Sequence, residues 1–463
     1  MLMKPDPTFY PSPKLAMQAP PEKLAFVSSF DPSGSRPDAL KVVDVDPAST
    51  AYGTFVGGVD MPNAGDELHH FGWNACSSAL CPYAPHPHVE RRYLIVPGLR
   101  SSRIHVVDTK PDPRHPRIVK VIEPEEVAAR AGYTRPHTIH CGPDGIYVSG
   151  LGSPTGEGPG GIFMLDHFGF DVLGRWEVDR GPQYFAYDFW WHLGHDTVLT
   201  SEWGTPKMIE NGINPELLLS SQYGHHLHVW NLRRRRHEQA IDLGKQHQLV
   251  LELRPSHDPT RTYGFVGVVV SLEDLSASIW LWHRADGKWE ARKVISIPAE
   301  PADESDLPPL LKGFKAVPPL VTDINLSLDD RFLYVSCWGT GELQQYDVSD
   351  PFNPKLAGSV RIGGIARRTP HPKAPGLALN GGPQMVELSR DGKRVYFTNS
   401  LYRAWDEQFY PDGIKSWMAK LDVAPEGGIS LDPRFFLNFD GLRGHQVRLE
   451  GGDASSDSFC YPS

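Results

Sequence analysis

Short apolar runs recur along this chain, and turns rich in Asp and Gly separate them. In each repeat an apolar run leads through a loop to a second run, as in 330–336 followed by 342–348. Because the runs are short and bounded by turn residues, the pattern predicts β-strands in pairs. Seven pairs fit this description: 24–27 with 40–45, 92–96 with 103–108, 144–149 with 161–166, 196–200 with 228–230, 265–268 with 279–282, 330–336 with 342–348, and 391–398 with 418–423.

The repeat predicts an all-β fold, a seven-bladed β-propeller. One four-stranded sheet cannot bury both of its faces, whereas radial stacking of several sheets buries them and leaves no long exposed edge. The 463 residues give about 66 per unit, which is long for a blade, so we expect long loops covering one face. We expect one domain over 1–463, with 1–23 as an N-terminal extension and a closing blade built from strands of both chain ends.

Composition agrees with a turn-rich β protein, because the chain contains 44 Gly and 43 Pro residues. Few helices are expected. The best short helix is 124–132, which begins with Pro and ends with Gly.

Charge and hydropathy argue against several partners. A net charge of −10 disfavours nucleic acid, and the basic run Arg233–Arg236 is interpreted as a solvated hairpin turn. No stretch reaches the roughly 18 apolar residues that span a membrane. The N-terminal residues hold no apolar signal core, so a cytoplasmic location is expected, or a periplasmic one if a leader is missing from this sequence. The five cysteines follow no regular spacing, which favours reduced thiols.

Histidine groups supply the candidate chemistry. They comprise His69 with His70, His137 with His140, the cluster within 225–228, and His445. Neutral imidazole binds borderline and soft transition metals well, and no catalytic-serine signature accompanies these groups, so a metal centre is predicted. Each histidine group, taken alone, could equally well have a purely structural role. The prediction rests on their joint occurrence at similar places in the repeat.

A common offset favours one shared site. Counting back the same number of residues from each Asp turn reaches the strand that we expect to be innermost in its blade. Side chains at the start of such a strand face the central tunnel. The positions reached are His137, Asp188, Leu251 beside Glu252, Asp323, Gln384 and His445. Strand alternation would direct His137 and His140 to opposite sides unless a β-bulge intervenes.

A cysteine and an aromatic run each allow two interpretations. Cys76 is either a thiolate ligand or nucleophile, or a buried free thiol. The aromatic run 184–191 favours core packing over a substrate box, although it could wall off a small apolar pocket.

Several segments resemble the selenium-binding protein/methanethiol oxidase family. The first reads Leu-His-His-Phe-Gly-Trp-Asn-Ala-Cys-Ser-Ser, and they run in order along nearly the whole chain. They are 68–78, 121–124, 187–190, 201–203, 322–334, 381–385 and 400–412. The resemblance implies a seven-bladed propeller. As in bacterial members of the family, it also implies a copper-dependent oxidation of methanethiol with O2 and water to formaldehyde, hydrogen sulfide and hydrogen peroxide.

The resemblance also implies the site residues and partners. The histidines that match the family pattern, and are the expected metal ligands, are His69, His70, His137, His140, His226 and His445. Asp323, on a predicted inner strand, is expected to orient an imidazole or to act as a base for water addition, with a structural role as the alternative. Copper is the expected cofactor, and a small thiol and O2 are the expected partners; the oligomeric state is left open.

The chain departs from the family at its cysteines. It has Tyr52 and Gly53 where the family carries its selenium-linked cysteine, and Ala79 and Ala454 where the family has further cysteines. Selenium carriage is therefore not expected. Two alternatives stay open: a non-catalytic propeller that carries selenium, a metal or a partner, and another metal-dependent propeller oxygenase of the iron-using, carotenoid-cleaving kind.

Overall fold

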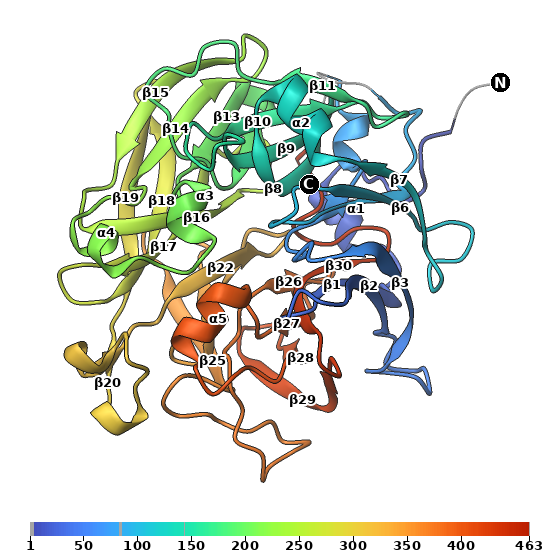
Figure 1. The fold of residues 1–463 in the computed structure, drawn as a ribbon. Coiled ribbons are helices and arrows are strands. Elements are labelled where there is room, and N and C mark those ends of the chain that lie inside the picture. Colours follow the sequence, from blue (N-terminus) through green and yellow to red (C-terminus); the bar gives the residue numbers. More distant parts are fainter. Residues whose placement is uncertain (1–3, 83–85, 143, 463) are drawn as a thin grey trace.

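Four-stranded antiparallel sheets surround a central axis in the computed structural model, which describes residues 4–82, 86–142 and 144–462 (Figure 1). Seven such sheets are present in the described chain, with few helices, and they form a β-propeller. The predicted fold class is therefore confirmed. No helix of the described residues is long and apolar enough to cross a membrane.

Six blades run in chain order from the axis to the rim. Their innermost strands are buried almost throughout, as in β16, whereas rim strands such as β15 alternate exposed and half-buried residues. The strands are β4 (Gly72–Trp73), β5 (Tyr93–Pro97), β6 (Ile104–Asp108), β7 (Arg117–Ile122); β8 (Thr134–Gly142), β9 (Gly145–Gly152), β10 (Gly161–Leu165), β11 (Val172–Arg175); β12 (Phe189–His192), β13 (Thr197–Ser201), β14 (His226–Asn231), β15 (Arg236–Asp242); β16 (His247–Pro255), β17 (Tyr263–Ser271), β18 (Ala277–Ala285), β19 (Lys288–Ile297); β22 (Val321–Leu326), β23 (Phe332–Cys337), β24 (Glu342–Asp347), β25 (Lys355–Arg361); β26 (Val386–Leu388), β27 (Arg394–Thr398), β28 (Trp417–Val423), β29 (Ile429–Asn438).

The closing blade joins the two ends of the chain, as predicted. Its strands are β3 (Phe55–Ala64), β2 (Pro37–Asp44), β1 (Leu24–Phe30) and, innermost, β30 (Arg443–Leu449). β30 pairs antiparallel with β1, so that Ala25 lies opposite Leu449. The propeller is therefore closed by main-chain hydrogen bonds between residues more than 400 positions apart.

Short helices occur mainly in the connections. The expected helix at 124–132 is α2 (Pro124–Ala131), and Gly132 ends it in the left-handed conformation at φ 69°. The basic run forms the turn between β14 and β15, also as predicted. The remaining helices are α1 (Pro13–Met17), α3 (Pro206–Ile209), α4 (Pro215–Leu219) and α5 (Arg403–Phe409), with single turns η1 (Ser77–Leu80), η2 (Leu193–His195), η3 (Glu304–Asp306) and η4 (Lys312–Phe314).

Long loops cover the mouth at which the innermost strands begin. They carry α3, α4, α5 and the two-stranded β20 (Glu300–Pro301) and β21 (Ala316–Val317). Their apolar side chains form a large buried cluster that includes Trp203, Tyr223, Trp338, Tyr402 and Trp405. This apolar cap separates the axis from solvent at that end.

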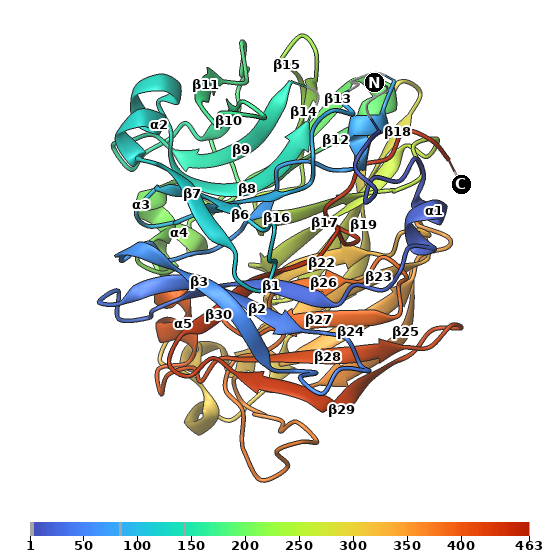
Figure 2. The same ribbon diagram turned by 90° about the vertical axis from the view of Figure 1, so that its right-hand side faces the viewer.

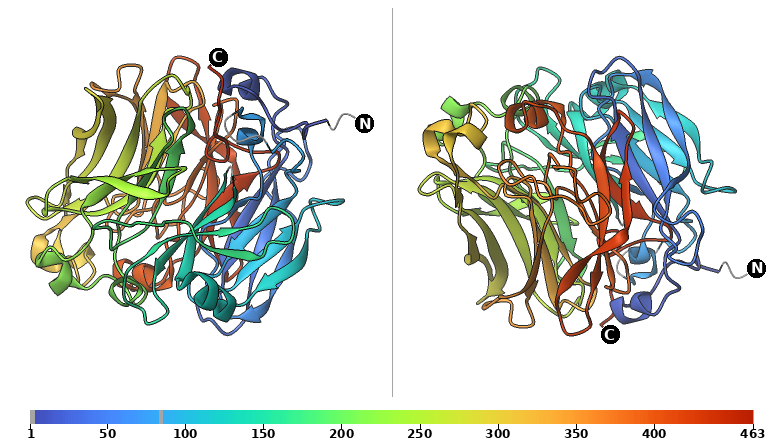
Figure 3. Two further views of the ribbon diagram at one scale, coloured as in Figure 1. Left: turned by 90° about the horizontal axis from the view of Figure 1, so that it is seen from above. Right: turned by 90° about the horizontal axis from the view of Figure 1, so that it is seen from below.

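The C-terminal segment lies against the opposite mouth, where the innermost strands end. Trp191 Nε1 donates to Ser458 Oγ at 3.0 Å, and the Ala454 N–H donates to the Leu388 carbonyl at 3.0 Å. Asp457 forms a buried ion pair with Arg91 at 2.7 Å. Figures 2 and 3 place α1 beside this C-terminal segment, so both lie near the same mouth.

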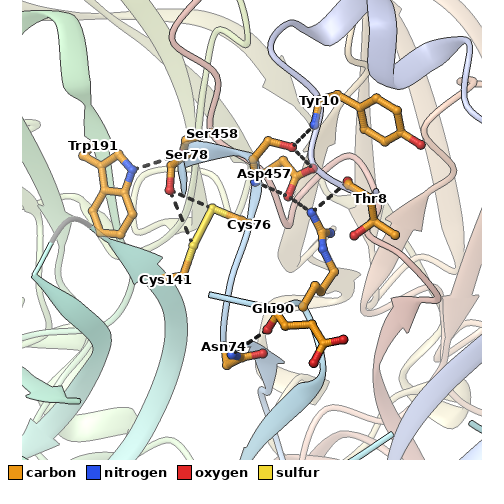
Figure 4. Close-up of a disulfide and its surroundings, with 12 residues drawn as sticks. Thr8, Tyr10, Asn74, Cys76, Ser78, Glu90, Cys141, Trp191, Asp457 and Ser458 are labelled. Carbon is orange, nitrogen blue, oxygen red and sulfur yellow. Dashed lines mark hydrogen bonds and ion pairs between the residues drawn. A yellow bond between two sulfur atoms is a disulfide. The ribbon is translucent and has the colours of Figure 1, made fainter. Parts of the chain in front are cut away.

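Four of the five cysteines are paired, which corrects the expectation of reduced thiols. Disulfides join Cys76 to Cys141 (Figure 4) and Cys81 to Cys460. Cys337 is a buried free thiol. The partners are separated by 65 and 379 positions, so no local spacing indicated the pairs. Cys76 is therefore neither a thiolate ligand nor a free thiol here.

Candidate metal centre

Four imidazoles gather at the capped mouth of the axis. His69 and His70 come from the loop before β4, His137 from β8 and His445 from β30. Ring centroids lie 3.7 Å apart for His69 and His445, and 3.9 Å apart for His70 and His137. All four side chains are buried. We call this group the histidine centre.

The closing blade holds the loop that carries His69 and His70. Ser28 Oγ on β1 donates to the His69 carbonyl at 2.7 Å, and the Phe71 N–H donates to Gln446 Oε1 on β30 at 2.6 Å. Gly72 then permits close approach to β8, because a Cβ there would lie 2.7 Å from the Ile139 carbonyl oxygen. The loop backbone is thus fixed from both sides.

The pairing of β8 contains a register irregularity, but His137 and His140 still diverge. The register with β9 shifts between Pro136 and Ile139. His137 joins the histidine centre, whereas His140 packs edge-on against Trp190, with ring centroids 3.9 Å apart. His140 therefore lies farther along the axis, beyond the other imidazoles.

The imidazoles offer free nitrogen lone pairs. His445 Nδ1 lies 2.9 Å from the Ser400 carbonyl, which only accepts, so this nitrogen carries the proton and Nε2 is left with its lone pair. His69 Nδ1 and the Nε2 atoms of His70, His137 and His445 have no hydrogen-bond partner within the described chain. Single ligand atoms of His69, His70 and His445 lie within 4.8 Å of one another. Buried unpaired nitrogens of this kind are rare without a ligand.

Burial keeps the centre neutral. It holds the pKa of His69, His70 and His137 well below the usual value, and repulsion between the neighbouring imidazolium forms acts in the same direction. Burial also lowers the pKa of His445 to about 3. Neutral imidazole is the form that binds metals, so the centre is poised to accept an ion at neutral pH.

A buried charge network lies directly below the histidines. Glu252 Oε1 on β16 lies 3.6 Å from His70 Nε2 and accepts a 2.9 Å hydrogen bond from the Tyr187 hydroxyl. Arg254 pairs with Glu252 at 3.1 Å, with Asp323 at 3.2 Å and with Asp188 at 3.5 Å. One guanidinium therefore faces three carboxylates in a site closed to water.

Asp323 contacts this network rather than a histidine. Its second oxygen accepts from the Val386 N–H at 2.7 Å. Burial raises the pKa of both Asp323 and Asp188 well above the usual value, although Arg254 opposes that rise. A role for Asp323 in the chemistry stays a prediction, and any such role would run through Arg254.

His226 lies in a second group away from the axis. It opens β14, the third strand of its blade, and its Nδ1 lies 3.1 Å from Glu202 Oε2. His225, His228 and Asp242 surround it. The structure thus brings together four of the six predicted ligands, and places His140 and His226 elsewhere.

Aromatic side chains wall the histidine centre. Tyr187 and Trp203 approach His137, with ring centroids at 4.4 and 6.3 Å, and Tyr402 stands at 6.0 Å from His69. Trp190 and Trp191, in contrast, flank His140 and line a cavity at the C-terminal mouth. The aromatic run therefore serves both packing and the site wall.

Residue patterns alone did not single out Arg254. It lies on the same innermost strand as Leu251 and Glu252, and two charged residues in a wholly buried strand were the available signal. Arg448 on β30 was also missed; it lies three positions after His445 and pairs with Glu387. Burial raises the pKa of Glu387 to about 7.

Fold and site together define the class of protein: a seven-bladed β-propeller with four buried imidazoles at one mouth of its axis. The sequence profile of the 56kDa selenium binding protein (SBP56) family matches residues 3–460, so this chain belongs to that family. It is 42% identical to a Xenopus laevis protein named methanethiol oxidase, over 97% of each chain. It is 40% identical to selenium-binding protein 1 of Arabidopsis thaliana, over 97% of this chain and 94% of that protein.

Solved structures agree with this placement. The X-ray structure of a hypothetical selenium-binding protein from Sulfolobus tokodaii is 60% identical, with a TM-score of 0.96 over 99% of this chain and 100% of the other. A putative 6-phosphogluconolactonase from Bacteroides uniformis is 10% identical, with a TM-score of 0.55 over 93% of this chain and 100% of the other. At that identity, only the propeller fold is shared.

Proposed function

We propose that this protein is a copper-dependent thiol oxidase that converts methanethiol, O2 and water to formaldehyde, hydrogen sulfide and hydrogen peroxide. The single observation that carries the proposal is the histidine centre, with buried, neutral imidazoles that have unpaired nitrogens. The reaction balances with one molecule of each reactant and one of each product. Two electrons leave the methyl carbon for O2, and water supplies the carbonyl oxygen of formaldehyde.

His69, His70, His137 and His445 would hold the copper. The donor set fits, because borderline and soft metals prefer imidazole nitrogen and each of these residues has a buried ring nitrogen with no hydrogen-bond partner in the described chain. Copper bound there would supply a soft acceptor for the thiolate sulfur and a path for electrons to O2. The Ser400 carbonyl fixes the tautomer of His445, as expected for a ligand held by an outer contact.

Glu252 is assigned to take the thiol proton. It is the carboxylate that approaches His70, and the Tyr187 hydroxyl and Arg254 hold its two oxygens in place. Those contacts leave the carboxylate oriented toward the histidine centre without a side-chain rearrangement. A positioned base of this kind contributes to proton transfer.

The apolar cap excludes water and favours small substrates. Tyr187, Trp203 and Tyr402 border the histidine centre, and their rings pack against one another and against Trp405. A thiol without a bulky substituent is therefore expected to be the best substrate. A thioether, which lacks an S–H proton for Glu252 to accept, is expected to be a poor one.

The test combines metal analysis with turnover. Copper-loaded protein is incubated with methanethiol under air, while oxygen uptake, sulfide and peroxide are followed together. We expect the three to change in equal amounts. We also expect His69→Gln with His445→Gln to lose bound copper and turnover, whereas His371→Gln, a buried histidine stacked on Phe436 outside the centre, keeps both.

Two outcomes would favour the alternatives. Full copper occupancy without turnover would support a non-catalytic carrier. Turnover with iron but not with copper would support another propeller oxygenase. The absence of cysteines at Gly53, Ala79 and Ala454 argues against selenium carriage in this chain.

A further inference from the structure

A second donor group lies on the hairpin formed by β14 and β15. His226 opens β14, and Asp242, the last residue of β15, is its direct partner in the antiparallel register. His225 precedes them, and its carbonyl accepts a 2.9 Å hydrogen bond from the Leu243 N–H. The strand register thus brings two histidines and one carboxylate to the same end of the hairpin.

Both imidazoles are anchored through Nδ1. His225 Nδ1 lies 3.2 Å from the Tyr223 carbonyl, and His226 Nδ1 lies 3.1 Å from Glu202 Oε2. Since a carbonyl and a carboxylate only accept, each Nδ1 carries a proton, and in the neutral ring each Nε2 keeps its lone pair. Contacts of this kind from a carbonyl or a carboxylate are typical of histidines that bind metals.

The free nitrogens point at one carboxylate oxygen. Asp242 Oδ1 lies 3.8 Å from His225 Nε2 and 3.9 Å from His226 Nε2, and the three donor atoms all lie within 4.8 Å of one another. These separations are too long for hydrogen bonds. Two donors bound to one zinc ion at about 2.0–2.2 Å are at most about 4.4 Å apart, so the carboxylate separations already fit a shared ion.

Glu202 is itself held rigidly. Its Oε2 accepts from the backbone N–H groups of His225 and His226 at 3.2 and 3.0 Å, and its Oε1 lies 2.9 Å from His228 Nε2. His228 Nδ1 in turn lies 2.9 Å from His237 Nε2. The carboxylate that orients His226 is therefore fixed before any ion arrives.

We propose that His225, His226 and Asp242 form a second metal site, which takes a divalent borderline cation such as Zn²⁺ and is independent of the histidine centre. Two imidazoles and one carboxylate are a common zinc donor set. The side chain of Asp242 is 59% exposed and that of His226 is 30% exposed, so the remaining coordination positions face solvent. This site exchanges its ion readily, whereas the histidine centre lies under the apolar cap.

Zinc itself is the probe for the test. Metal-free protein is dialysed to equilibrium against micromolar Zn²⁺, and bound zinc is measured per chain for the wild type and for His225→Gln with Asp242→Asn. We expect the double variant to bind one equivalent less than the wild type. The matched control is His115→Gln with Asp112→Asn, an exposed His–Asp pair 2.7 Å apart, which should bind as much zinc as the wild type.

The outcomes separate this site from the histidine centre. His69→Gln with His445→Gln should keep the equivalent that the hairpin variant loses. Equal zinc binding by the wild type and the hairpin variant would overturn the proposal, as would loss of that equivalent in the His115 control. The single substitution Asp242→Asn is milder than the double variant. Circular dichroism and thermal unfolding of its metal-free form check that a loss of bound zinc does not reflect a loss of folded protein.

Discussion

Glu252 joins the histidine centre to the buried charges of the axis. Its role can be tested by a substitution that changes only its carboxylate group. Its neighbours Tyr187 and Arg254 donate to it from two sides. Glutamine at this position keeps the size of the side chain and removes its ability to accept a proton. The centre itself is left intact.

We expect Glu252→Gln to lower kcat for methanethiol by about 100-fold while copper content stays the same, because general-base groups contribute about 10²–10⁴-fold. Oxygen uptake and metal analysis on the same sample check this. Glu342→Gln, which removes a buried carboxylate paired with Arg361, is the matched control and should leave kcat unchanged. Loss of copper in the Glu252 variant would instead make Glu252 part of the metal-holding structure.

At this scale the sequence predicted residue types better than residue positions. His137 and His445 meet because a common offset before the Asp turns marks entry to the axis, whereas His69 reaches it from the loop before β4. His226 shares their chemistry but lies on the third strand of its blade, and the pairing of 196–200 with 228–230 already indicated a non-inner strand. Local sequence does not encode distance from the axis. Histidine density alone therefore predicted more ligands for the centre than the structure brings together.

Between elements, a buried polar group at the outer strands helps to link the closing blade to its neighbour. Tyr52, after β2, donates to Asp432 on β29 at 2.6 Å, and Lys420 on β28 pairs with Asp432 at 2.9 Å. Burial alone would raise the pKa of Asp432, but the bonds from Tyr52 and Lys420 outweigh it and lower the pKa to about 2. Tyr52 precedes Gly53, where the family resemblance places a cysteine, and here it supports blade packing.

We expect Asp432→Asn to reduce the free energy of unfolding by about 3 kcal/mol at pH 7, because it removes the buried partner of Lys420 and leaves only the exposed Asp422. The native pKa lies below the unfolded value of about 4, so the contribution is present above pH 4 and lost as pH falls toward 2. Urea unfolding at pH 7 and at pH 3 checks this, with a smaller difference at pH 3.

Asp422→Asn is the control for that experiment. Asp422 also contacts Lys420, at 2.8 Å, but its side chain is 56% exposed, so the loss should be below about 1 kcal/mol. Equal losses for the two variants would contradict the assignment of the stabilising contact to Asp432.

The strands that the sequence predicted were the middle two of every blade. These are short runs with apolar residues next to turn residues, and all seven pairs occur in the structure. The flanking strands carried weaker signals: β4 has only two residues, and rim strands such as β25 are half exposed throughout. Both depend on neighbouring sheets for their pairing or burial, which a local pattern does not contain.

Over the whole molecule, the two disulfides differ in how much of the chain they enclose. Cys81–Cys460 spans 379 positions, whereas Cys76–Cys141 spans 65. In the chain-entropy account these loops stabilise the folded state by about 6 and about 4 kcal/mol. We therefore expect Cys81→Ser with Cys460→Ser to destabilise the oxidised protein more than Cys76→Ser with Cys141→Ser does.

Urea unfolding of the oxidised variants measures that difference in stability. The difference should vanish when the variants are reduced, and the reduced wild type is the reference. Thiol titration of unreduced, denatured wild type should find one reactive thiol, Cys337, among the five cysteines. Five reactive thiols would show that the pairs do not form in solution.

The pairing of β1 with β30 also sets the order in which this protein can be completed during synthesis. β1 leaves the ribosome early, but its partner is the last strand made, so one edge of the first sheet stays unpaired through almost all of translation. At roughly 5–20 residues per second, that wait lasts roughly 20–80 s. An unpaired edge attracts other strands, so nascent chains are most exposed to misassociation in this interval.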